Sequence, residues 1–457
     1  MKNPIKVLYI SSRGDSGAGG ENYLLTLFRN IDLSKVKPIV VLPNEGSLRA
    51  PLETLGIEVI VIEADYGWLK PDVAWYKVLG GLQDRVKNLV SIINNKQIDL
   101  VHTNSNLRFE GALAAHLSGT PHLYLAHIEF QPDMPIFQRL PLSLPSFAQL
   151  MGELSDFTVA VSQSVADTLS THIPTDKLQV IHNGLELEKF DSALKNRSDT
   201  LKQDLGIPDD SILITAVGRI TPDKGFDYFL DAAAQVLQRY KENNVHFIIV
   251  GIEEHHDFTE SLKQKASEYS ITDHFHFLGF RKDVPDILAE SDIFVLSSRK
   301  EGHPYVMLEA MASECAVVAS DCAGVEETIE EDVSGFIVPI GDIELLAKRL
   351  TALIDSKELR IRMAKSARKR IEDSFTADKT AKALMAVYEK LLSLPNKIPG
   401  SYGTELFLQN CTEIAHLGKK NIDLNERLKR LEHIADLFLD NFMFNLLRKI
   451  KHLIQNK

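Results

Sequence analysis

One short loop of this sequence carries two side chains that suit the binding of a diphosphate. Arg219 and Lys224 lie in the run Gly218–Gly225, which follows an apolar, strand-like run and precedes a helical stretch. Arginine binds phosphate oxygens through a bidentate fork, and lysine binds them as a point charge. The run therefore indicates a diphosphate site, although an ordinary strand-to-helix loop with exposed basic residues is the alternative.

A second motif places two glutamates around a helix start. Glu301 precedes Gly302, His303 and Pro304, and Glu309 follows within the same run. Proline suits the first turn of a helix, and the free N–H groups of that turn favour a phosphate. Glu301 can then face a sugar, and Glu309 can accept both hydroxyls of a ribose. Taken alone, a helix cap and a solvated helix residue are the alternative roles.

A glycine-rich run, Gly17–Glu21, follows the first strand-like run and includes Gly19 and Gly20. Glycines let the backbone approach a ligand closely and leave N–H groups available. The run lacks the G-x-G-x-x-G spacing of a dinucleotide-binding loop, so by itself it indicates no more than a turn.

Short apolar runs alternate with longer helical stretches along most of the chain. The strands and helices that this pattern predicts must position the motifs. Continuous apolar runs are typical of strands buried on both faces, and their alternation with helices predicts parallel sheets. The expected strands are Lys6–Ile10, Pro38–Leu42, Glu58–Ile62, Leu100–Val101, His122–Ala126, Thr158–Val161, Ile212–Val217, His246–Val250, His276–Leu278, Ile293–Leu296, Ala316–Ala319 and Gly335–Val338.

The polar stretch near Asp191–Pro208 separates these strands into two series, which predicts two doubly wound α/β domains. We expect a first domain over residues 1–190 and a second over 191–375. A helix at 376–394 would cross back to the first domain. Ligands of such domains lie at the carboxyl ends of the strands, here in a cleft between the domains.

The chain changes character after Leu394. Residues 395–457 are expected to form a helical tail with a short heptad seam and a basic amphipathic segment. Peripheral contact with a membrane, self-association, and packing on the chain's own domains are the three alternatives for this tail.

The composition limits the classes of function. The chain has 457 residues and a formal net charge of -12, which argues against a general nucleic-acid binder. Its three cysteines form no disulfide framework, no signal peptide is indicated, and no apolar run is long enough to span a membrane. We therefore expect a cytoplasmic protein, with peripheral attachment to the membrane as an alternative.

These motifs together resemble the GT4-type family of retaining glycosyltransferases, which have the two-domain GT-B fold. The resemblance extends from about Lys6 to Leu392. It implies that Arg219 and Lys224 hold the phosphates of a donor. It further implies that Glu309 binds the ribose and that Glu301 lies by the donor sugar and the reaction centre.

Further positions gain a role only through this resemblance. His127 resembles the histidine that contacts the donor sugar, and Phe280 lies in a loop that resembles the one facing the base. Gly19 and Gly20 would approach the phosphates or the acceptor. The neighbours of Glu301 complete the implied donor site: Gly302, His303 and Pro304. The turn His182–Gly184 resembles the one that closes the first domain, and we interpret it as structural.

One segment departs from the family pattern. The run Gly251–Glu254 follows a strand where many relatives have a second glycine, so the departure lies on the expected base side of the donor site. Within the first domain, the segment Phe130–Leu150 is rich in apolar residues and proline. It can line an acceptor site or touch lipid, but a packed loop and helix is an equal alternative.

The resemblance implies transfer of a sugar from a nucleotide diphosphate, UDP- or GDP-linked, to a saccharide or lipid-linked acceptor. Retention of configuration favours a front-face route, because no residue is an obvious nucleophile for double displacement. We expect no metal, since the sequence contains no Asp-x-Asp motif and the cationic loop with a helix start can stabilise the leaving diphosphate. A sugar-nucleotide epimerase and a non-catalytic scaffold working through its tail are the alternative functions.

Overall fold

The computed structural model describes residues 4–17, 19–64, 79–105, 107–132, 137, 143–198, 200–240, 244–395, 399–400, 404 and 407–413. These residues form two compact units. Unit 1 contains the described residues of Met1–Val161, Val165–Ile181 and Ala381–Lys457. Unit 2 contains those of Ser162–Ser164 and His182–Thr380. The first long segment of unit 2 thus begins at His182, earlier in the chain than the boundary expected at residue 190.

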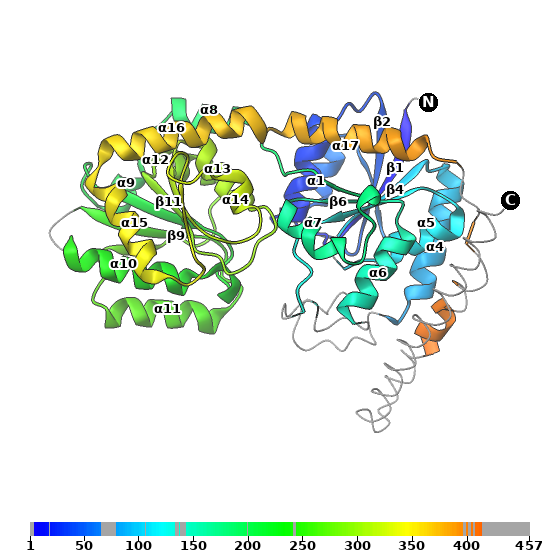
Figure 1. The fold of residues 1–457 in the computed structure, drawn as a ribbon, viewed down its shortest axis with the longest axis horizontal. Coiled ribbons are helices and arrows are strands. Elements are labelled where there is room, and N and C mark those ends of the chain that lie inside the picture. The colour runs from blue at the N-terminus through cyan, green and yellow to red at the C-terminus, as the bar shows by residue number, and fades with distance from the viewer. Residues whose placement is uncertain are drawn as a thin grey trace, which may run out of the picture. The chain divides into compact units, whose positions relative to one another are not determined.

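Unit 1 is built on a parallel sheet of seven strands in the order β3-β2-β1-β4-β5-β6-β7 (Figure 1). The strands are β1 (Ile5–Ser11), β2 (Val36–Leu42), β3 (Glu58–Val61), β4 (Leu100–Asn104), β5 (His122–Ala126), β6 (Phe157–Ala160) and β7 (Leu178–Val180). The accompanying helices are α1 (Gly19–Asn30), α2 (Arg49–Thr54), α4 (Leu82–Lys96), α5 (Glu110–Ser118), α6 (Leu144–Leu154) and α7 (Gln163–Ser170). The chain reverses its direction of winding between β1 and β4, so this is the switch point of the sheet.

Unit 2 is built on a parallel sheet of six strands in the order β10-β9-β8-β11-β12-β13. The strands are β8 (Ile212–Val217), β9 (Val245–Val250), β10 (Phe275–Phe277), β11 (Ile293–Leu296), β12 (Ala316–Ser320) and β13 (Phe336–Val338). The helices are α8 (Glu188–Lys195), α9 (Thr200–Leu205), α10 (Phe226–Arg239), α11 (His256–Glu268), α12 (Val284–Glu290), α13 (Tyr305–Ala312), α14 (Val325–Thr328), α15 (Ile343–Asp355) and α16 (Lys357–Ser374). Its switch point lies between β8 and β11.

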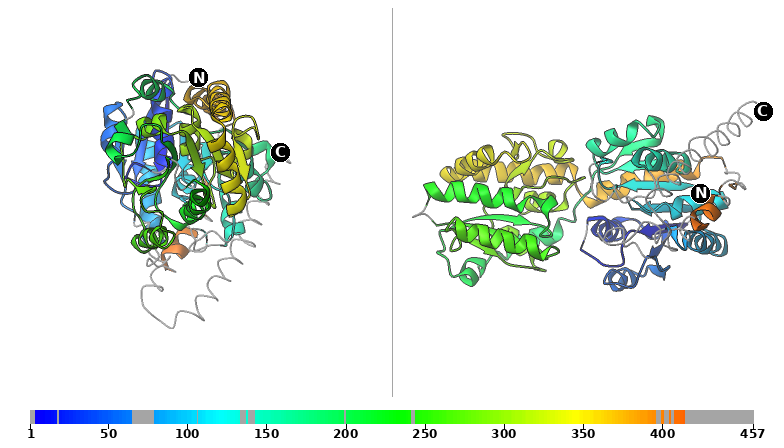
Figure 2. Two further views of the ribbon diagram at one scale, coloured as in Figure 1. Left: turned by 90° about the vertical axis from the view of Figure 1, so that its left-hand side faces the viewer. Right: turned by 90° about the horizontal axis from the view of Figure 1, so that it is seen from below.

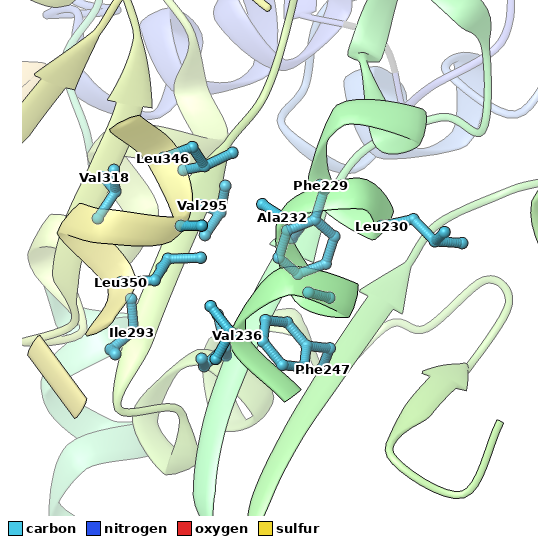
Figure 3. Close-up of a cluster of buried hydrophobic side chains, with 14 of the residues drawn as sticks. Phe229, Leu230, Ala232, Val236, Phe247, Ile293, Val295, Val318, Leu346 and Leu350 are labelled. Atoms are coloured by element: carbon cyan, nitrogen blue, oxygen red, sulfur yellow. The ribbon is translucent and has the colours of Figure 1, made fainter. Parts of the chain in front are cut away.

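Helices cover both faces of each sheet (Figure 2). Sheets enclosed in this way must bury both faces of their strands, which explains the continuous apolar runs. In unit 2, Phe229 and Val236 of α10 point toward Phe247 of β9 and Val295 of β11 (Figure 3). Each of these four side chains is at most 1% exposed, so they form a dry core beneath the loops at the carboxyl edge.

Helix α17 (Ala377–Leu392), the last long helix among the described residues, leaves unit 2 at Thr380 and belongs to unit 1 from Ala381 onward. Within unit 1, Tyr388 shares a hydrogen bond of 2.9 Å with the hydroxyl of Tyr9 on β1. It also lies 2.7 Å from Nδ1 of His102 on β4. All three side chains are buried, so the end of α17 is an integral part of the core of unit 1.

The predicted fold class, two parallel α/β domains with a helical C-terminal region, is confirmed. The heptad seam and the basic amphipathic segment predicted within 395–457 lie outside the described residues. So do residues 133–136 and 138–142 of the segment considered for the acceptor. Among the residues that the structure describes, no helix is both long and apolar enough to cross a bilayer.

Candidate active site

The switch point of unit 2 brings the two charged motifs together. The loop after β8 carries Lys224, and the loop after the neighbouring strand β11 carries Glu301. Their side chains form an ion pair in which Nζ lies 2.6 Å from Oε1. Ser298 donates a hydrogen bond of 2.7 Å to the same carboxylate oxygen. Because both side chains are mostly buried, this pair is a defined feature of the site and not a loose surface contact.

The cationic loop is held in shape by its contacts with the loop after β11. Gly225 adopts a left-handed conformation with φ of +63°, and a Cβ atom there would overlap the carbonyl oxygen of Ser297. The Ser297 hydroxyl donates a 3.0 Å hydrogen bond to the carbonyl of Lys224. Arg299 pairs with Asp227 at 2.5 Å, and its guanidinium lies 3.9 Å from the centre of the Tyr228 ring. Arg299 was not among the residues predicted from the sequence.

Arg219 lies in the same loop as Lys224 but is held by a different carboxylate. Its Nη1 atom is 2.5 Å from Oε2 of Glu254, which belongs to the loop after β9. Gly251, in that loop, packs so closely on the carbonyl of Gly218 that a Cβ atom there would overlap it. Each predicted phosphate-binding cation is therefore paired with a carboxylate, and the two carboxylates come from different strand ends.

Helix α13 begins beside this site, with Pro304 as its N-cap residue and no side chain capping its first N–H groups. Glu309 lies within the helix and is partly exposed. Burial raises the pKa of Glu309 to about 7, against a smaller lowering by Lys189. A helix start without a side-chain cap and a carboxylate that titrates near neutrality are both suited to a polar, anionic ligand.

His303 and Gly302 are buried, and the His303 side chain faces the interior. Nε2 of His303 lies 3.0 Å from the Thr328 hydroxyl, and the ring packs against His182 and Phe375. Burial lowers the pKa of His303 to about 3. Asn183 donates a 2.8 Å hydrogen bond to its carbonyl. A donor contact of His303 would thus have to come from its backbone, while the turn containing Asn183 supports the loop from behind.

Two exposed apolar side chains mark the predicted base side of unit 2. Phe280 is 64% exposed and Ile252 is 49% exposed. Their loops are joined where the Gly251 N–H donates a 2.9 Å hydrogen bond to the carbonyl of Gly279. The structure therefore places Phe280 near the run that departs from the family pattern, at the carboxyl ends of β9 and β10.

The corresponding switch point of unit 1 joins three polar groups. Asn104 ends β4, and its side-chain NH2 donates a 2.9 Å hydrogen bond to the carbonyl of Gly20. Its Oδ1 atom lies 2.8 Å from Nε2 of His127, which follows β5. Gly19 is exposed at the start of α1. Asn104 was missed by the sequence reasoning, although a polar residue at a strand end beside a switch point is a usable signal.

The hydrogen-bond pattern of Asn104 fixes the protonation of His127. A backbone carbonyl only accepts, so the Asn104 amide nitrogen must face Gly20 and its oxygen must face His127. Nε2 of His127 therefore carries the proton. Burial lowers the pKa of His127 to about 4, so the ring is neutral at pH 7, with Nδ1 as its acceptor nitrogen. Tyr23 packs edge-on against this ring at 5.4 Å.

Taken together, unit 2 has two cations and an uncapped helix start, which can bind a diphosphate, and two carboxylates, Glu301 and Glu309, which can accept hydrogen bonds from hydroxyl groups. Unit 1 offers a neutral imidazole beside a glycine-rich turn. No group of three or more histidine, cysteine, aspartate or glutamate side chains in the described part of the chain is arranged to hold a metal ion.

Two family models match the chain, one on each half. Residues 17–189 match the model described as Glycosyltransferase Family 4, and residues 197–370 match Glycosyl transferases group 1. The residues of the unit 2 site, from Arg219 to Glu309, lie within the second match.

Individual proteins extend this likeness. The chain is 28% identical over 310 residues to the UDP-Gal:alpha-D-GlcNAc-diphosphoundecaprenol alpha-1,3-galactosyltransferase of Escherichia coli, covering 66% of this chain and 79% of that protein. It is 24% identical over 392 residues to the N,N'-diacetylbacillosaminyl-diphospho-undecaprenol alpha-1,3-N-acetylgalactosaminyltransferase of Campylobacter jejuni, covering 82% of this chain and 97% of that protein. The crystal structure of Anabaena HepE in complex with UDP superposes with a TM-score of 0.70 at 22% identity, covering 84% of this chain and all of that one.

Proposed function

We propose that this chain, which belongs to the GT4-type glycosyltransferases, transfers a hexose or N-acetylhexosamine from UDP to a lipid-linked saccharide, with retention of configuration. It is a transferase enzyme, and its relatives act in glycolipid and polysaccharide assembly. The choice of UDP over GDP is supported by the donor named for the Escherichia coli relative. The choice of acceptor is supported by two relatives whose names include a diphosphoundecaprenol-linked sugar.

The observation that carries this proposal is the contact between Lys224 and Glu301 at 2.6 Å. A transferase must bind the diphosphate and the sugar of its donor through neighbouring groups. Here Lys224, which would bind the diphosphate, contacts Glu301, which would bind the sugar. The uncapped start of α13 lies in the same loop region and adds N–H groups for the phosphates.

In this proposal the leaving diphosphate is stabilised by fixed positive charge. As the bond between the anomeric carbon and the diphosphate oxygen breaks, negative charge develops on that oxygen, and the sugar becomes oxocarbenium-like. Lys224, Arg219 and the α13 N–H groups would receive that charge, and the reaction would then need no metal. The leaving oxygen then takes the proton of the acceptor hydroxyl, which attacks from the same face and so gives retention.

Other residues position the reactants. Glu301 would accept hydrogen bonds from the donor sugar, and Glu309 would accept them from the ribose. Phe280, exposed beside the β9 loop, would pack on the base. In unit 1, His127 would contact the donor sugar, and Gly19 and Gly20 would contact the phosphates or the acceptor. We further propose that the chain works in the cytoplasm, in peripheral contact with the membrane that contains its acceptor.

The proposal is tested by incubating the full-length protein with radiolabelled UDP-hexoses and UDP-N-acetylhexosamines, together with undecaprenyl-diphosphate-linked sugars. The product should be a lipid-linked glycoside whose anomeric configuration by NMR matches that of the donor. GDP- and ADP-linked donors are the comparison set. Transfer only from GDP donors would contradict the choice of nucleotide, and inversion would contradict the front-face route.

A transferase is distinguished from a sugar-nucleotide epimerase by repeating the assay without the acceptor. An epimerase would change the sugar of the nucleotide donor, whereas a transferase would leave that sugar unchanged apart from slow hydrolysis.

A further inference from the structure

We propose that Glu254 is a counter-ion of Arg219 that the donor's diphosphate must displace, and that it weakens the binding of both the donor and the nucleotide product. The inference rests on the proposed function, because it assumes that Arg219 meets the diphosphate. It concerns a carboxylate that has no role in the reaction described above.

The pair is placed by the backbone of two joined loops. Arg219 and Glu254 approach to 2.5 Å, and each side chain is about one third exposed. The Ile220 N–H donates a 2.8 Å hydrogen bond to the carbonyl of Ile252, and a short parallel bridge joins Ile220 to Glu253. The loop after β9 is thus fixed against the loop after β8, and the carboxylate of Glu254 is held beside the guanidinium.

The neighbouring carboxylate does not share this position. Glu253 lies 2.6 Å from Nδ1 of His256, at the start of α11, and so engages a different partner. Lys224 is also paired, but with Glu301, which has a sugar-binding role of its own in the proposed function. Glu254 is assigned no ligand in the proposed function, and unlike Glu253 it cancels the charge of a phosphate-binding cation.

Binding of a diphosphate would therefore exchange one ion pair for another. A partly exposed ion pair is weak, so the dianionic ligand can displace the carboxylate. The displaced carboxylate stays tethered near the phosphates, where its charge repels them at the short range and intermediate dielectric of a partly exposed site. The expected result is a lower affinity for the diphosphate and a faster departure of the nucleotide product.

The test compares the full-length protein with Glu254→Gln and Glu254→Ala, using calorimetric titration with UDP. Both changes remove the charge, and we expect the Kd for UDP to fall by about three- to tenfold. Uridine, which lacks phosphates, serves as the second probe by ligand-observed NMR, and its affinity should not change. Glu253→Gln is the matched control, because it removes an adjacent carboxylate that is paired elsewhere, and it should leave the Kd for UDP within about twofold.

Several outcomes would overturn the inference. An unchanged or higher Kd for UDP in both Glu254 variants would mean that the carboxylate does not oppose the diphosphate. Tighter binding of uridine as well as UDP would mean that Glu254 acts on the nucleoside and not on the diphosphate. An equal gain in UDP affinity from Glu253→Gln would mean that the effect comes from the net charge of the protein and not from the position of Glu254. Failure of the unaltered protein to bind UDP would instead count against the proposed nucleotide, so the two failures are distinguishable.

Discussion

Lys224 and Glu301 meet as an ion pair of 2.6 Å, although they lie in loops that follow two different strands. They meet because β8 and β11 are neighbours at the switch point of their sheet. In the proposed reaction the lysine stabilises the leaving diphosphate, and the glutamate accepts hydrogen bonds from the sugar. Each therefore also holds the other in place before the donor binds.

Lys224→Met should lower kcat/KM by at least about a hundredfold, because the leaving group loses a fixed cation and Glu301 loses its partner. Steady-state kinetics with the UDP donor would measure this. Lys348→Met, which alters another lysine of unit 2, is the control and should keep full activity. A Lys224 variant with a correct fold and kcat/KM within threefold of the unaltered protein would rule out the assigned role.

Asn104→Asp should give the transfer reaction a new dependence on pH. A carboxylate facing Nε2 of His127 raises the pKa of that ring from about 4 toward neutrality, so activity should fall as the pH drops below about 7. His102, whose pKa is about 3, and the phenol of Tyr23 are two further titratable groups near this ring. Asn104→Leu should instead lower activity equally at all pH values. Matching pH profiles of kcat/KM for the two variants would show that Asn104 does not control the protonation of His127.

Glu309→Gln should stabilise the ligand-free protein near pH 7 and weaken its binding of nucleotide. The pKa of Glu309 is raised from 4.5 to about 7 in the folded state, so the folded state holds a proton that the unfolded state has released. The stability from this proton is complete below pH 4.5 and is lost as the pH rises through 7. The gain in Tm of the variant should therefore grow from pH 5 to pH 7.5. A gain that is constant or reversed across this range would show that Glu309 is already ionised at low pH.

The affinity of the unaltered protein for UDP should increase with pH over the range in which its stability decreases. A protonated Glu309 accepts hydrogen bonds from ribose hydroxyls less well, so the Kd for UDP should rise as the pH falls from 7.5 to 5.5. Calorimetric titrations at several pH values would measure this. Glu309→Gln should bind UDP more weakly and with a smaller dependence on pH, because only the terminal phosphate of UDP, with a pKa of about 6, still titrates in this range.

A cluster of stacked histidines should make unit 2 sensitive to acid. His246 packs on His274 at 5.0 Å and on His276 at 5.3 Å. Burial, with the two neighbouring histidines, lowers the pKa of His246 from 6.5 to about 4. The unfolded state therefore binds the proton first, and stability is lost as the pH falls from 6.5 toward 4. His246→Phe should reduce this loss in denaturant titrations at pH 5, and His255→Phe, at an exposed position, should not.

Much of the fold is predictable because both sheets are buried on two faces. The β8 run Ile212–Val217 is apolar except for Thr215 and forms the strand expected from it. β7 was not predicted, because it has three residues and Gln179 interrupts its apolar character. Expected strand ends differ elsewhere, as at β4, which continues through His102, Thr103 and Asn104. Those polar side chains are buried by neighbours that sequence periodicity does not reveal.

The residues of the site were predictable only where a charged side chain follows an apolar, strand-like run in the sequence. Lys224 and Glu301 each follow an apolar run, so their common edge could be anticipated. The pairing of Arg219 with Glu254 depends on how two loops pack, and nothing in the sequence indicates it. The inward orientation of His303 likewise depends on Thr328 and Phe375, which are distant along the chain.

The contact of Tyr388 with Tyr9 and His102 has a consequence for how the protein is made. A ribosome delivers β1 and β4 first, then all of unit 2, and only afterwards the part of α17 that contains Tyr388. Unit 2 can close its core as soon as it has emerged, since each domain tends to fold as a unit. In the half of the protein that is translated first, the hydroxyl of Tyr9 and the imidazole of His102 can therefore form these hydrogen bonds only after α17 has been synthesised.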